Sequence, residues 1–517
     1  MAIKETDVRG TPGWWMKRLH AQMEAERPRL ELLQNYLDGR PKLPWESKDL
    51  NSKFARFQRA SRTNYAEMLV EAPVERFGIR SIETAADDDE DGDEAAERLA
   101  TANNLDDRFG QAARMAYTFG WSYLSSAAPA GEFSDQATIC HEDPRTMTVD
   151  VHPLTGHVRA AFKLMHDSAL ELDIAILWLP GEKHVAVRTN ARTGSSSTAD
   201  KSGERSELLP NLVRVRFSLE DFEMRGKRPD DADEDDDYWS ESYDKRPVPV
   251  RRVMHRDGVG VFEKHLDVLD RINHLVFVIM VIATTQAFRQ RTMEQSTGEG
   301  VDPLPEKDDD GNLINYDELF EAGPDALWLL PPGASIKELG QAEIQSMLGM
   351  VKDDTMKLSA ATGTPMSMFS PDAVNQSAEG VAQSRERMVF RSEAFLRTAG
   401  RDLAWVIAEA FYFMGDDQKR DDASRIAVNF RPVERNSLAQ MGSAIAQMYM
   451  AVPREWMWAK VLQATPKEVR QMKVQWGTQA MTDAVAAAKA TAGPTAPPNQ
   501  PTRPLTKAST GVRATGA

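Results

Sequence analysis

Residues 306–317 are the stretch of this sequence that most resembles a metal-binding motif. Acidic side chains stand at the first, third and fifth positions of the stretch, and Gly311 stands at the sixth, as in a loop that binds calcium. The first position is Glu306 rather than aspartate, and the twelfth is Asp317 rather than the glutamate that binds calcium through both oxygens. The pair Asp310-Gly311 is instead a frequent signal of a hairpin turn. We therefore predict a turn here and no metal site.

The sequence lacks the other motifs that would indicate catalysis. It contains no phosphate-binding loop of the form G-x-x-x-x-G-K-[ST], no H-E-x-x-H, no G-x-S-x-G and no Cys/His spacing typical of zinc. His265 and His274 are nine residues apart on one expected helix, a spacing that does not match the usual separation of metal ligands. We predict that the protein is not an enzyme and that it uses no cofactor.

Two short acidic runs account for most of the net negative charge. The chain carries 63 Lys and Arg against 79 Asp and Glu, a formal charge of −16. Residues 87–94 and residues 230–237 hold seven acids each and no base, so the remainder sets 63 bases against 65 acids. Runs of this kind are usually solvated loops. The body of the protein is therefore expected to be nearly neutral, with two acidic loops attached.

Long helices with elaborate connections dominate residues 258–414. Apolar residues recur every three or four positions over 261–293, and they surround the helix completely over 275–283. We expect the stretch 275–283 to be buried on every side, against its own domain or against other subunits. It is too short to span a membrane, and we predict no membrane association.

Two more helices follow the polar insert at 294–340. The sequence predicts one over 341–361 and a very long one over 378–414, with the break Thr362-Gly363-Thr364-Pro365 after the first of them. Long helices without catalytic residues are typical of a structural subunit of an oligomeric assembly.

The remaining pattern completes an α+β fold that is mainly helical, in two to four domains. Residues 14–38, 95–103 and 108–119 have helical apolar spacing, whereas residues 146–189 alternate and predict two antiparallel hairpins. Residues 484–517 are rich in Ala, Pro and Thr, with bases and no acids, and we expect a disordered basic tail.

Several short segments resemble portal proteins of tailed bacteriophages, of the siphophage head–tail connector type. These segments are 35–39, 64–79, 116–123, 143–145, 362–365 and 377–380. The resemblance extends over most of residues 14–480. It depends on the order of the elements and on several weak local matches rather than on one diagnostic motif.

The resemblance implies a ring of twelve subunits, each with wing, stem, clip and crown regions. The implied boundaries are 1–257 for the wing, 258–293 and 341–361 for the two stem helices, 294–340 for the clip, 362–377 for the tunnel loop, 378–434 for the long wing helix and the strand after it, 435–483 for the crown and 484–517 for the tail.

It also implies a role in a virion, at one capsid vertex, after assembly in the host cytoplasm. Double-stranded DNA would be packaged and ejected through the ring without sequence-specific contacts. The implied partners are other copies of the chain, the large terminase subunit, a head–tail adaptor, and the major capsid and scaffolding proteins. A nearly neutral body fits a sliding duplex, since each phosphate–cation contact adds affinity.

Three groups of residues follow from this assignment. The residues expected to face DNA from the tunnel loop are Met366, Met368, Phe369, Ser370, Asp372 and Asn375. The residues expected to pack the stem are Phe262, Leu266, Leu269, Ile272, Val276 and Ile279. The residues expected to face the adaptor from the clip are Asp308, Asp310, Asn312 and Tyr316.

Two other functions stay open at this point. The chain could be another ring-forming virion structural or scaffolding protein, or a DNA-packaging nuclease. A nuclease would need carboxylates spaced on a folded core to hold two metal ions. The acids of this sequence are instead concentrated in runs of low complexity, which disfavours that alternative.

Overall fold

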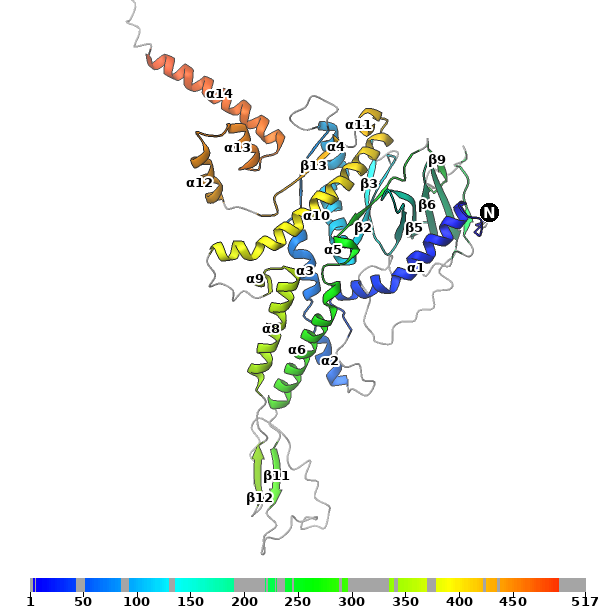
Figure 1. Ribbon diagram of the computed structural model, residues 1–517, viewed down its shortest axis with the longest axis vertical. Coiled ribbons are helices and arrows are strands. Elements are labelled where there is room, and N and C mark those ends of the chain that lie inside the picture. Colours follow the sequence, from blue (N-terminus) through cyan, green and yellow to red (C-terminus); the bar gives the residue numbers. More distant parts are fainter. Residues whose placement is uncertain are drawn as a thin grey trace, which may run out of the picture. The chain divides into compact units, whose positions relative to one another are not determined.

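The computed structural model divides the chain into two compact units, Met1–Asn436 and Ser437–Ala517. The residues it describes are 3–4, 6–42, 52–84, 93–129, 135–189, 219, 222–227, 229, 238–243, 246–287, 291–295, 334–338, 343–369, 378–421, 425–434 and 438–491. Helices and strands both contribute to the first unit (Figure 1), in agreement with the predicted α+β class.

The helices of the first unit largely follow the apolar spacing of the sequence. They are α1 (Pro12–Leu37), α2 (Ser52–Ala60), α3 (Tyr65–Val74), α4 (Glu94–Ala102), α5 (Leu105–Phe119), α6 (Leu266–Ala287), α8 (Ile344–Thr362), α9 (Met366–Phe369), α10 (Ala378–Phe413) and α11 (Asp417–Asp421). The helix predicted over 261–293 is shorter than expected. Its start is a 3₁₀ turn, η4 (Glu263–His265), preceded by η3 (Arg256–Gly258), and a strand begins at Arg291.

The described strands form four small sheets. They are β1 (Ile79–Glu83), β2 (Trp121–Ala127), β3 (Thr138–Glu142), β4 (Met147–Val151), β5 (Val158–Asp167), β6 (Leu172–Leu179), β7 (Glu182–Thr189), β8 (Glu223–Met224), β9 (Glu241–Ser242), β10 (Val250–Met254), β11 (Arg291–Gln295), β12 (Ala334–Glu338) and β13 (Ala427–Phe430). The largest sheet has the order β4-β5-β6-β7-β8, with β9 also paired to β7. The two predicted hairpins are confirmed, because β4 pairs with β5 and β6 with β7, both antiparallel.

The main hydrophobic core is built around α5 and α10. Each helix contributes four fully buried residues at the spacing i, i+3, i+4 and i+7, which places them on one helical face. These residues are Phe109, Ala112, Ala113 and Ala116 on α5 and Leu403, Val406, Ile407 and Ala410 on α10. Helix α10 crosses β10, β2 and β13, so it connects two of the sheets to this core (Figure 1).

The first acidic run is in part structural, which corrects its interpretation as a solvated loop. Asp93 is 2% exposed and forms the N-cap of α4, where its carboxylate accepts hydrogen bonds from the backbone amides of Ala95 and Ala96. The ammonium of Lys419, from α11, lies 2.7 Å from the same carboxylate. The run therefore ends in a buried ion pair that joins two distant parts of the chain.

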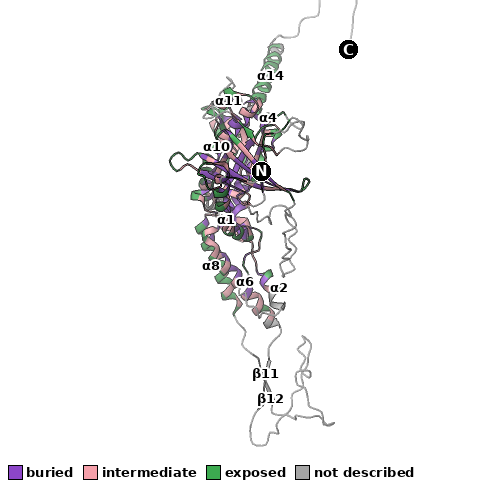
Figure 2. Ribbon diagram, turned by 90° about the vertical axis from the view of Figure 1, so that its right-hand side faces the viewer, coloured by how far each residue is buried: buried purple, intermediate pink, exposed green. Residues whose placement is uncertain are grey.

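Helices α6 and α8 pack side by side (Figures 1 and 2), and strands β11 and β12, which come between them in the sequence, pair with each other. The antiparallel register runs from Arg291 opposite Glu338 to Gln295 opposite Ala334. The polar insert is thus closed at its base by a hairpin, which the helical interpretation of 291–293 had not foreseen. Figure 2 shows mostly half-buried and exposed residues along both helices.

The second unit consists of α12 (Leu438–Met448), α13 (Arg454–Lys460) and α14 (Pro466–Thr491). The rings of Trp458 and Trp476 lie 6.5 Å apart, and the guanidinium of Arg454 stacks on Trp476 at 4.2 Å. Helix α14 continues through residues 484–491, so the prediction of a disordered segment from 484 is wrong for these residues, and residues 492–517 lie outside the described part of the chain. The reason is that alanine, abundant in this stretch, is the strongest helix former.

Candidate functional site

The α6–α8 pair is held together by a two-point ion pair. Arg271 of α6 donates from Nε and Nη2 to the two carboxylate oxygens of Asp354 on α8, each at 2.7 Å. The carboxylate is nearly buried, whereas the guanidinium is 52% exposed. Hydrogen bonding from Arg271 holds the pKa of Asp354 below its usual value. Parallel hydrogen bonds of this kind fix the relative position of the two helices.

The beginning of α6 is anchored in the main core. Phe262, Leu269 and Ile272 are buried there, and Leu266 and Val276 pack against the same cluster. Polar contacts add to the anchor, since the hydroxyl of Tyr36 donates to Asp270 at 2.7 Å. Five of the six residues expected to pack the stem therefore pack within the single chain.

The end of α6 is different, and here the expectation of complete burial is wrong for the single chain. Of residues 275–283, Phe277 is the one that the chain buries. Its apolar neighbours are half-buried, Ile279 among them, and Ala283 is exposed. We call residues 275–282 the apolar band of α6. A continuous apolar surface of this kind on a helix usually marks an interaction site.

The segment after α8 begins with a helix end that α10 caps. Gly363 adopts a left-handed φ of 73°. Arg387 Nη1 donates to the carbonyl of Ala360 at 2.6 Å, and Arg391 Nη1 donates to the carbonyl of Thr362. Cations at a helix C-terminus satisfy carbonyls that have no partner within the helix and interact favourably with its dipole.

The expected tunnel loop is partly helical. Met366, Met368 and Phe369 belong to the short helix α9, and the ring of Phe369 meets that of Tyr65 edge-on at 5.3 Å. The other expected DNA-facing residues, Ser370, Asp372 and Asn375, lie outside the described residues. The expected clip residues lie outside them as well: Asp308, Asp310, Asn312 and Tyr316. Their roles stay predictions.

Replacing Asp354 with asparagine is expected to loosen the helix pair. The change removes the charge that Arg271 meets, and we expect a loss of about 1 kcal/mol because the guanidinium is half solvated. Hydrogen exchange should accelerate at the amides of α6 and α8. Asp353→Asn is the matched control, since Asp353 pairs with Lys357 on the exposed side of α8 at 2.6 Å. Equal acceleration in both variants would contradict the prediction.

Residues that the sequence analysis missed include Arg387 and Arg391. In the sequence they stand among several arginines and glutamates of one long helix, with nothing to mark them. Their spacing of four places them on one helical face, but the helix end that they cap belongs to another part of the chain. A signal was available only in the Thr362-Gly363 break, because glycine commonly follows the end of a helix.

Across the described residues, no group of three or more His, Cys, Asp and Glu side chains is arranged to hold a metal ion. In the same part of the chain, no helix combines the length and the hydropathy needed to cross a membrane.

Comparisons with known proteins find distant likenesses among solved structures. No family model matches the sequence, and no curated protein matches it. The chain is similar to one from the virion of a native gene transfer agent particle, with 10% identity and a TM-score of 0.42, over 81% of this chain and 95% of that one. It is also similar to chains from the neck of the empty particle (11% identity, TM-score 0.41) and of the native particle (11%, 0.39), at the same coverage.

Proposed function

We propose that this chain is the subunit of a phage-type portal, a ring through which double-stranded DNA enters and leaves a capsid at one vertex. The observation that carries the proposal is the apolar band of α6, which the single chain leaves half-buried. A second copy packed on this band would remove apolar surface from water, a gain of about 25 cal/mol per Å². Repeating that contact around an axis closes a ring.

The order of the elements supports the same assignment. In this proposal α6 and α8 are the stem, and the strand pair β11–β12 is the base of the clip. The connector after α8 is the tunnel loop, and α10 is the wing helix behind it. The proposed ring has twelve subunits and no catalytic activity of its own.

The charge distribution supports a conduit rather than a DNA-gripping protein. Outside the two acidic runs the chain is nearly neutral, and a duplex slides more readily where few phosphate–cation contacts form. In this proposal the ring assembles in the host cytoplasm and becomes part of the virion. It binds the large terminase subunit during packaging and a head–tail adaptor afterwards, and it contacts the capsid and scaffolding proteins.

Ring formation can be tested with one substitution in the apolar band. Ile279→Asp places a charge on the surface that the next subunit would cover, and burying an unpaired carboxylate is costly. We expect the unmodified chain to form large closed rings in native mass spectrometry and negative-stain images, and Ile279→Asp to remain monomeric.

The matched control is Gln345→Asp, which introduces the same charge at an exposed position of α8. It should form rings like the unmodified chain. Persistent monomers of the unmodified chain under all conditions, or rings of normal size from Ile279→Asp, would overturn the proposal. A metal-dependent nuclease assay on the same preparation separates the proposal from a packaging nuclease.

A further inference from the structure

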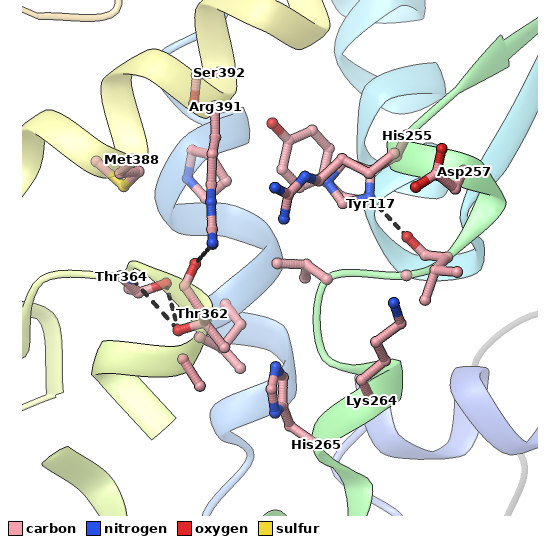
Figure 3. Close-up of a pocket in the computed structure, with 17 residues that line it drawn as sticks. Tyr117, His255, Asp257, Lys264, His265, Thr362, Thr364, Met388, Arg391 and Ser392 are labelled. Carbon is pink, nitrogen blue, oxygen red and sulfur yellow. Dashed lines mark hydrogen bonds between the residues drawn. The ribbon is translucent and has the colours of Figure 1, made fainter. Parts of the chain in front are cut away.

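A cavity of about 260 Å³ lies where several elements of the first unit meet (Figure 3). Its lining comes from α3, α5, the turn after β10, the segment that leads into α6, the end of α8, and α10. Pockets for drug-sized ligands usually measure about 300–1,000 Å³. The size of this cavity therefore suits a small ion with some of its water.

Positive charge dominates the lining of this cavity. Arg256, Lys264 and Arg391 all line it, and the single carboxylate among the lining residues is that of Asp257. Within the described residues, none of these three cations forms an ion pair with a carboxylate. Figure 3 shows that two of them come from different sides, Arg391 from α10 and Lys264 from the segment before α6.

Burial, reinforced by the neighbouring cations, lowers the pKa values of the two histidines in the lining. The pKa of His255 is lowered to about 4 by burial and, to a smaller extent, by Arg256 and Arg391, while a hydrogen bond to the carbonyl of Val259 acts in the opposite direction. Burial also lowers the pKa of His265, and the neighbouring cations act in the same direction. Asp257 supplies the single carboxylate of the lining, so positive charge remains in excess around both rings.

Two buried hydroxyl groups complete the lining. Tyr117 is 3% exposed and Ser392 is 1% exposed, and both line the cavity. Their hydroxyls lie near each other, yet neither makes a hydrogen bond of good geometry in the structure. Leaving a buried hydroxyl without a partner is unfavourable, so a bound acceptor at this position would be stabilised.

The wall that carries Arg256 is a strained turn. The φ values of Arg256, Asp257 and Gly258 are 29°, 59° and 75°. All three are positive, and residues other than glycine rarely adopt positive φ values. Non-glycine residues in such conformations are concentrated at ligand clamps and switch regions. The turn presents Arg256 to the cavity.

We propose that this cavity binds a small tetrahedral oxyanion of the phosphate or sulfate type. Such an ion supplies negative charge that compensates the three cations. Its oxygens accept hydrogen bonds from guanidinium, ammonium and hydroxyl groups. Binding would connect the turn after β10, the start of α6 and α10 through one ligand. The inference does not depend on ring assembly.

Isothermal titration of the full chain with inorganic phosphate, at constant ionic strength set by NaCl, tests the proposal. We expect saturable binding of one ion per chain. Lys264→Gln and Arg256→Gln should each weaken the affinity about tenfold, the effect of losing one charge-assisted hydrogen bond. Tyr117→Phe keeps the buried aromatic side chain and removes only its hydroxyl, so it should weaken phosphate binding by a smaller factor.

Lys17→Gln is the matched control, because Lys17 is an exposed cation that pairs with Asp7 away from the cavity. It should bind phosphate like the unmodified chain. A second titration, with a short DNA duplex, identifies where the bound phosphate group comes from. If the duplex displaces inorganic phosphate, the site binds a phosphate of the DNA backbone. If only the free ions bind, the site binds phosphate or sulfate from solution. No saturable heat at about 10 mM phosphate, or equal losses in Lys17→Gln and Lys264→Gln, would overturn the proposal.

Discussion

Gly120→Ala is expected to destabilise the first unit by about 2–5 kcal/mol. Gly120 ends α5 with a φ of 94°, a left-handed conformation that costs a residue with a Cβ atom about 1–2 kcal/mol. A Cβ at this position would also lie 2.2 Å from the carbonyl oxygen of Gly258, a backbone atom that cannot rotate away. Forced displacement in a packed region adds about 1–3 kcal/mol.

The junction around Gly120 explains why the backbone cannot yield. Arg29 of α1 donates to the carbonyls of Phe119 and Gly258 at 2.9 Å and 3.2 Å. The amide of His255 donates to the carbonyl of Gly120 at 2.8 Å. Three segments distant in sequence are thus fixed to the same turn.

Urea unfolding followed by tryptophan fluorescence measures the Gly120→Ala effect, since Trp121 is the next residue. Gly110→Ala is the matched control. Gly110 lies within α5 and has open space where a Cβ would stand, so alanine should stabilise the helix by about 0.5–1 kcal/mol. An unchanged unfolding midpoint for Gly120→Ala would refute this account of the junction.

Asp93→Ala is expected to lower stability by about 3–5 kcal/mol, the usual cost of breaking a buried ion pair by removing one partner. The variant leaves the ammonium of Lys419 buried without its nearest carboxylate and removes the cap of α4. Asp93→Asn keeps a capping oxygen and should recover about 1 kcal/mol of the loss. The double variant Asp93→Asn with Lys419→Met should cost less than the sum of the single changes.

The contribution of Asp93 also depends on pH. Burial alone would raise the pKa of its carboxyl, but hydrogen bonds from Lys419, Thr84 and two backbone amides outweigh burial and hold the pKa below its ordinary value of 3.8. The stabilisation is therefore present above about pH 4 and is lost as the pH falls through the folded-state pKa. Thermal melts of the unmodified chain and Asp93→Ala should converge below pH 4. A constant difference between them at all pH values would exclude this role.

Most long helices and both hairpins could be predicted because their apolar residues follow one clear period. Strand β2 does not follow from such a period, because five consecutive residues from Ser122 to Ser126 are buried and no alternation appears; only the resemblance of residues 116–123 implied a strand here. It is the central strand of β10-β2-β3, covered on both faces. The structural role of Asp93 was hidden for a different reason, since composition identifies an acidic run but gives no partner for one of its members.

The candidate site was less accessible to prediction than the fold. Its anchoring residues Phe262, Leu269 and Ile272 follow from helical spacing alone. The arginine caps of α8 and the cavity at the start of α6 do not, because they depend on contacts between segments far apart in the sequence. The apolar character of the band at 275–282 could be predicted from its sequence. Its solvent exposure could not, because that depends on which other segments of the chain pack against it.

The closed base of the polar insert has a consequence for how this protein can vary. Strands β11 and β12 bring Gln295 opposite Ala334, so the ends of the intervening segment are fixed whatever its length. The entropy of closing a loop grows only logarithmically, about 0.6 kcal/mol for each doubling. Length and sequence between these two residues are therefore nearly decoupled from the stability of α6 and α8. A longer or shorter segment between these two strands is therefore expected to leave the free energy of unfolding of the first unit nearly unchanged.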